Sequence, residues 1–67
     1  MKISVNGEAA ETQAKNLQEL CAALGHGHWQ DRIATALNGD FVPVLARIGT
    51  RLNEHDSIEI VTPRQGG

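Results

Sequence analysis

One short amphipathic helix is the feature that most restricts the fold of this chain. Apolar residues recur at the i, i+3, i+4 and i+7 spacing of a single helix face, at Leu17, Leu20, Cys21 and Leu24. Asn16 suits the N-cap, Glu19 stands at the capping-box position, and Gly25 suits the left-handed residue that ends a helix. Because so short a helix is unstable alone, we expect its apolar stripe to lie on a sheet.

Before this helix, the sequence predicts a hairpin. Residues 1–5 alternate between apolar and polar side chains, which is typical of a strand with one buried face. Asn6-Gly7 is a strong turn signal, because both residues tolerate positive φ. Residues 8–14 would form the return strand, whose weak pattern indicates an edge position.

After the helix, the sequence predicts a second hairpin and a last strand. Residues 33–37 read as a strand, Asn38-Gly39 as a tight turn, and residues 41–42 as a short partner strand ended by Pro43. The last strand covers residues 58–61. Its period-two pattern predicts Ile58 and Ile60 toward the helix, with Glu59, Val61, Ala34 and Ala36 on the open face.

The order of these elements predicts the architecture. A helix between two hairpins suits a crossover connection, so the first and last strands are expected to pair in parallel. Residues 44–53 have no clear pattern, and we expect Leu45, Ile48 and Leu52 to contribute single side chains to the core. Residues 54–56 would form the turn into the last strand. The fold class is therefore α+β, with a mixed four- to five-stranded sheet and one helix packed across it.

Length and composition exclude several function classes. A chain of 67 residues is one domain with little room for an internal active site beside its core, which favours a carrier or binding protein over an enzyme. The net charge is −2 without a basic patch, so nucleic acid is not an expected partner. The sequence shows no membrane-spanning run and no signal peptide. Cys21 is the single cysteine, so no intramolecular disulfide can form, and a cytoplasmic location is expected.

The end of the sequence predicts a thin tail on a rigid body. Pro63 stops strand pairing, and Gly66 and Gly67 have no side chains, so the expected division is a domain over residues 1–62 and a flexible tail over residues 63–67. A narrow terminal carboxylate on such a tail is suited to insertion into another enzyme's cleft. Terminal glycines also occur by chance, because chain ends are commonly small and polar.

Three segments carry a resemblance to a known family. They are residues 2–8 (KISVNGE), residues 36–43 (ALNGDFVP), and residues 56–61 (DSIEIV) running into Gly66-Gly67. In this order they resemble the ubiquitin-like β-grasp fold and, more narrowly, the ThiS family of sulfur carriers. The loop at residues 25–31 matches no family pattern, and Glu54-His55-Asp56 stands where the family often has Asp-Gly-Asp.

The resemblance implies a carrier that partner enzymes act upon. An E1-like adenylyltransferase (ThiF-like) would adenylate the Gly67 carboxylate with ATP, and a sulfur donor such as a cysteine desulfurase would convert it to a thiocarboxylate. Thiazole synthase (ThiG-like) would then take the sulfur for thiazole formation in thiamine biosynthesis. The chain would bind no cofactor itself, and ATP would be consumed by the partner.

The sequence itself indicates that a partner must activate the terminal carboxylate. A terminal carboxylate is anionic at neutral pH and a poor electrophile, and the sequence has no phosphate-binding Gly-x-x-x-x-Gly-Lys loop with which to activate it. Beside Gly67, the residues expected to contact partners are Gly66, Gln65, Arg64, Val61 and Ala36. Arg64 could pair with an acidic groove or simply keep the tail hydrated.

Other functions remain open from the sequence. The same fold could serve a different sulfur-transfer product, as in the small subunit of molybdopterin synthase, or act as a ubiquitin-like protein modifier or a non-covalent binding module. His26, His28 and His55 lack converging partners, so no metal site is predicted. Cys21 lies on the apolar helix stripe and is expected in the core, and Trp29 is expected to cover the helix end.

Overall fold

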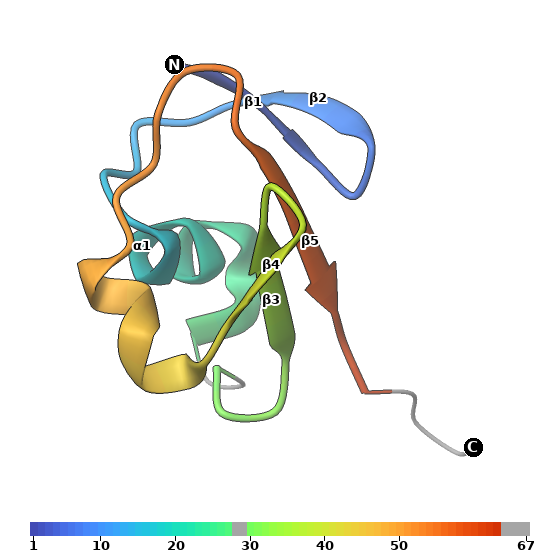
Figure 1. Ribbon diagram of the computed structural model, residues 1–67, viewed down its shortest axis with the longest axis vertical. Helices are drawn as coiled ribbons and strands as arrows, with labels where there is room; N and C mark the ends of the chain where they lie inside the picture. The colour runs from blue at the N-terminus through green and yellow to red at the C-terminus, as the bar shows by residue number, and fades with distance from the viewer. Residues whose placement is uncertain (28–29, 64–67) are drawn as a thin grey trace.

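The computed structural model describes residues 1–27 and 30–63 and contains a five-stranded mixed sheet crossed by one helix. The strands are β1 (Lys2–Val5), β2 (Glu8–Glu11), β3 (Ala34–Leu37), β4 (Asp40–Val42) and β5 (Ser57–Val61), in the spatial order β2-β1-β5-β3-β4 (Figure 1). β5 pairs in parallel with β1 and antiparallel with β3. The predicted α+β class and the parallel pairing of the first and last strands are confirmed.

Two Asn-Gly turns close the two hairpins of the sheet. Asn6 and Asn38 have φ of 52° and 51°, and the glycines that follow have φ of 83° and 89°. Positive φ at both central residues gives the turn whose twist matches the flanking strands. β2 lies at an edge as predicted, although it ends at Glu11 rather than Ala14.

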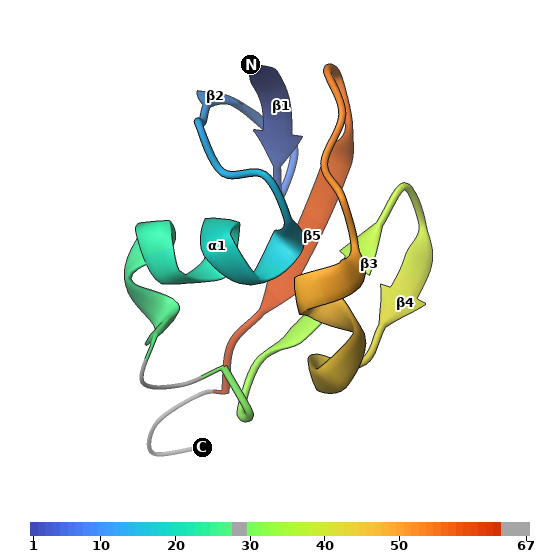
Figure 2. The same ribbon diagram turned by 90° about the vertical axis from the view of Figure 1, so that its left-hand side faces the viewer.

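The helix α1 (Leu17–Cys21) begins as the sequence predicts. Asn16 Oδ1 accepts the Glu19 N–H at 2.8 Å, and Glu19 Oε1 accepts the Lys15 N–H at 2.9 Å. In the usual capping box the acidic side chain binds the backbone N–H of the N-cap residue. Here the Glu19 carboxylate binds the backbone N–H of Lys15, the residue before the N-cap. In Figure 2, α1 lies across β5. The helix buries Leu17, Leu20 and Cys21.

The end of the helix differs from the prediction. The chain continues in the wider π-helical segment η1 (Ala22–His26), and Gly25 has the expected left-handed φ of 91°. A π turn spans one residue more than an α turn, so side chains after Cys21 rotate away from the predicted stripe. Leu24 was therefore wrongly predicted as a core residue, and its side chain is exposed.

The connection between β4 and β5 contains a 3₁₀ segment, η3 (Val44–Gly49), which the sequence pattern did not predict. Leu52 is buried as expected, but Leu45 is 92% exposed and Ile48 63% exposed, so these two core assignments were wrong. Arg47, between them in the sequence, is 1% exposed. The tighter 3₁₀ turn thus points the cation inward and its two apolar neighbours outward.

Three oxygens hold the Arg47 guanidinium inside the protein. Nε donates to Thr35 Oγ1 at 3.0 Å, Nη2 donates to the Ile33 carbonyl at 2.6 Å, and Nη1 donates to the Gln30 carbonyl. These acceptors belong to β3 and the segment before it. Arg47 therefore attaches η3 to the start of β3 with charge-assisted hydrogen bonds.

The core lies between one face of the sheet and the layer of α1 and η3. Its members are Ile3, Ala14, Leu17, Leu20, Cys21, Ile33, Val42, Leu52, Ile58 and Ile60. The predicted burial of Ile58, Ile60 and Cys21 is confirmed. No helix in the described part of the chain combines the length and the apolar composition needed to cross a bilayer.

We expect Arg47→Ala to lower the free energy of unfolding by about 3 kcal/mol, because it removes three charge-assisted hydrogen bonds and leaves the buried Ile33 carbonyl without its donor. Urea denaturation followed by circular dichroism would measure this. Arg51→Ala is the matched control: Arg51 is exposed, and its loss should change stability by no more than about 0.5 kcal/mol. Equal effects of the two substitutions would contradict the structural role of Arg47.

Burial raises the pKa of the Cys21 thiol, an effect that the Arg47 charge partly offsets. The unfolded thiol ionises near its ordinary pKa of about 8.5, whereas the folded thiol stays protonated to higher pH. Stability should therefore fall as pH rises above the unfolded pKa. Urea denaturation at neutral and alkaline pH would show this fall to be larger in the wild-type chain than in Cys21→Ala; identical pH dependence would contradict it.

Candidate functional site

The candidate site is the open face of the sheet where β5 ends. Gly67, Gly66, Gln65 and Arg64 lie outside the described residues, and the site consists of residues on the body of the domain. β5 ends at Val61, and Thr62 and Pro63 follow it, both exposed. The predicted partner residues Val61 and Ala36 are both described, and the strand register brings them to the same face.

Strand register builds two rows of side chains on this open face. Ala36 pairs with Phe41 on β4 and with Glu59 on β5, and Ala34 pairs with Val61 in the adjacent row. Because successive residues of a strand alternate between faces, Thr35, Val42 and Ile60 point to the core. The burial of these three residues therefore decides which side chains remain on the open face.

The open-face patch is formed by Ala34, Ala36, Phe41, Glu59 and Val61. These residues, with Thr35, line a depression of about 230 Å³. Phe41 is 69% exposed and Val61 67% exposed, while the two alanines keep the surface between them low. The depression between two exposed apolar side chains, with alanines at its base, can accommodate an apolar side chain of a partner.

Sequence reasoning placed the alanines and Val61 on this face but missed Phe41. The signal that could have found it is the two-residue loop Asn38-Gly39, because this loop pairs Leu37 with Asp40 and hence Ala36 with Phe41. Arg47 was also missed. Its burial depends on oxygens from a segment that is distant in sequence, and no local pattern indicates it.

The patch carries no chemistry of its own. Its one ionisable lining residue is Glu59, which is exposed. Cys21 lies in the core, where burial raises the pKa of its thiol and so disfavours the nucleophilic thiolate. Within residues 1–27 and 30–63, no three His, Cys, Asp or Glu side chains gather closely enough to hold a metal ion. His28 and Trp29, which the sequence analysis considered, lie outside the described residues.

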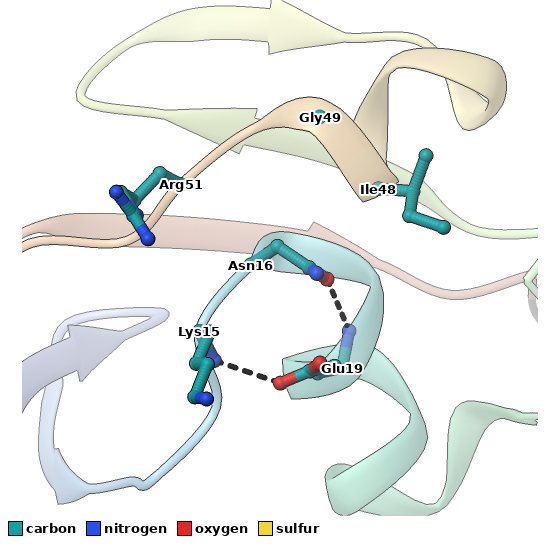
Figure 3. A pocket seen from close by; sticks show the side chains of 6 residues that line it. All are labelled: Lys15, Asn16, Glu19, Ile48, Gly49 and Arg51. Atoms are coloured by element: carbon teal, nitrogen blue, oxygen red, sulfur yellow. Dashed lines mark hydrogen bonds between the residues drawn. The ribbon is translucent and has the colours of Figure 1, made fainter.

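A second depression, of about 410 Å³, lies at the start of α1 (Figure 3). It is lined by Lys15, Asn16, Glu19, Ile48, Gly49 and Arg51. The Glu19 carboxylate accepts the Lys15 N–H, and the Asn16 amide caps the helix, so both polar groups serve the helix start (Figure 3). The lining contains no Ser, Cys or His that could act as a nucleophile or base.

Comparison with solved structures gives close matches in fold, among them the following two. A crystal structure of the thiamine biosynthesis protein ThiS from Geobacter metallireducens aligns over the whole of both chains with a TM-score of 0.81 and 26% identity. A solution structure of a thiamine biosynthesis protein from Geobacter metallireducens gives a TM-score of 0.83 at 26% identity, over all of this chain and 88% of that one. The β-grasp fold expected from the sequence is therefore confirmed.

Comparison with curated proteins gives no match. A family model described as "ThiS family" matches residues 3–67, which includes β1 from its second residue onward, the other four strands, the helix and the terminal glycines. This match agrees with the structural neighbours, which are thiamine biosynthesis proteins. The chain belongs to the ThiS family.

Proposed function

We propose that this protein is a sulfur carrier for thiazole formation in thiamine biosynthesis, and that Gly67 carries the sulfur as a thiocarboxylate. One observation supports this most directly: the central strand β5 leads straight from the core, beside the open-face patch, into the residues that end in Gly66-Gly67. The family match through residue 67 and the thiamine biosynthesis proteins of the same fold support the same function.

The proposed chemistry takes place on partner enzymes. A ThiF-like adenylyltransferase transfers AMP from ATP to the Gly67 carboxylate and releases pyrophosphate. The sulfur of a donor persulfide, such as that of a cysteine desulfurase, attacks the acyl carbon and displaces AMP. A thiol then reduces the resulting acyl disulfide, which leaves the thiocarboxylate and a disulfide. The carrier binds no cofactor and performs no catalysis itself.

The residues of the chain have two roles in this proposal. Gly66 and Gly67 allow the carboxylate to pass through a narrow active-site slot, with Arg64 and Gln65 contacting the partner on the way. On the body, Val61 and Ala36 contact the partner as part of the open-face patch, together with Phe41. A ThiG-like thiazole synthase is the proposed acceptor of the sulfur.

We expect intact mass spectrometry to show one oxygen replaced by sulfur after incubation with the adenylyltransferase, ATP and a persulfide donor. Deletion of Gly67 should abolish this change, and Gly67→Ala should slow it without altering folding. Gly49→Ala is the matched control, because a Cβ at Gly49 meets nothing within 4 Å.

The other possible outcomes separate the alternatives. Thiocarboxylate that thiazole synthase does not use would indicate a carrier for another product, such as a molybdopterin synthase small subunit. A cross-linked larger species would indicate a protein modifier. No mass change with an adenylyltransferase that is active on its own substrate would overturn the carrier function and favour a non-covalent binding module.

We expect Phe41→Ser to raise the KM for the carrier in the adenylation reaction by about tenfold, because exposed aromatic residues at interfaces commonly contribute more than 1 kcal/mol. Val61→Ser should act in the same direction. Leu45→Ser is the control, since Leu45 is still more exposed but lies on η3, outside the patch. The open-face patch would be excluded as the docking surface by equal KM values for Phe41→Ser and Leu45→Ser.

A further inference from the structure

β5 is longer than the neighbour on its parallel side. β1 and β5 are in register at Ser4↔Ser57 and Val5↔Ile58, where β1 ends and the chain turns back at Asn6-Gly7. β5 continues to Val61, and its antiparallel neighbour β3 accompanies it there through the pair Ala34↔Val61 (Figure 1). Beyond Ile58, therefore, β1 supplies no strand residue to pair with β5.

The side chain of Asn6 takes the place of the missing strand. Its Oδ1 accepts the Ile60 N–H at 2.8 Å, and its Nδ2 donates to the Ile60 carbonyl at 3.1 Å. The Asn6 backbone N–H also donates to the Ile58 carbonyl at 2.8 Å. One amide side chain thus satisfies both backbone polar groups of Ile60, as a paired strand residue would.

This contact lies at the last buried residue before the terminal segment. Ile60 is in the core, and the next residue, Val61, belongs to the open-face patch. We propose that Asn6 is a positioning residue for the reaction at Gly67: by holding β5 at Ile60, it fixes the position of the backbone to which the terminal residues are joined. This inference rests on the proposed function, because it assigns Asn6 a role in the same reaction.

The physical effect follows from the length of chain between the last firmly held residue and the carboxylate. Without the Asn6 amide, the backbone groups of Ile60 lose their partners, and β5 is held from both sides only as far as Ile58. A longer segment to Gly67 lowers the effective concentration of the carboxylate in the partner's active site. Contacts of the body with the partner are unchanged, so kcat should fall more than KM rises.

The chain contains a matched control for this role. Asn38 also precedes a glycine in a turn and also has positive φ, and its Oδ1 accepts the Ser57 N–H at 2.9 Å. Its backbone N–H donates to the Ser57 carbonyl at 2.7 Å, and its Nδ2 donates to Asp56 Oδ1 at 3.0 Å. Asn38 therefore holds the same strand by the same kind of contact, but at the end remote from residues 62–67.

The test compares Asn6→Gly with Asn38→Gly in the full chain. Glycine tolerates the positive φ of both turns, so each variant removes the amide while keeping the turn. For Asn6→Gly we expect faster hydrogen exchange at the Ile60 amide, and a kcat for adenylation by the ThiF-like enzyme lowered about threefold to tenfold. KM should stay within about twofold. For Asn38→Gly, exchange should accelerate at Ser57, with kcat and KM both within about twofold of wild type.

Equal kcat values for the two glycine variants would overturn this role of Asn6 and leave the proposed function intact. A wild-type chain that the enzyme never adenylates would overturn both, while the exchange at Ile60 would still report the contact itself. If Asn6→Gly fails to fold, Asn6→Asp replaces it, since it keeps the Oδ1 acceptor and loses only the donor to the Ile60 carbonyl. Its kcat should then lie below that of Asn38→Gly, and a kcat equal to or above it would overturn the role.

Discussion

The structure depends on how firmly β5 is held. This strand pairs with β1 on one side and with β3 on the other, and Asn6 and Asn38 extend these contacts to Ile60 and Ser57. Each hairpin of the fold contributes one strand that pairs with β5, and α1 lies across it (Figure 2). A small domain with a single helix has few other ways to hold its last strand in one register.

That register also determines the surface available to partners. A shift of one residue in β5 would exchange its two faces, bringing Glu59 and Val61 into the core and Ile60 to the open face. The burial of Ile60 therefore maintains the open-face patch, although Ile60 itself is not part of it. Arg47 contributes at a greater distance, since its hydrogen bonds to Thr35 and to the Ile33 carbonyl fix the start of β3, which pairs with Val61 through Ala34.

Elements with a strong local pattern, and the parallel pairing of β1 with β5 that their order implies, could be predicted from the sequence, whereas side-chain contacts between distant residues could not. The Asn16 cap and the two faces of β5 follow from local spacing, and both were predicted correctly. Arg47 could not be found in this way, because its acceptors meet it only after β3 and η3 come together. The same holds for the site: Val61 follows from alternation, but the contact of Asn6 with Ile60 joins residues 54 positions apart.

The two Asn-Gly turns show how one local signal can serve two purposes. Each dipeptide closes a hairpin, and that role needs only positive φ, which glycine would supply equally well. The asparagine side chains do something further, because both reach β5 and satisfy backbone groups that β1 and β3 leave open. In the proposed reaction no group of the body takes part in bond making. The contribution of the body is therefore geometric: it presents a partner surface and holds the origin of residues 62–67 at a fixed place beside it.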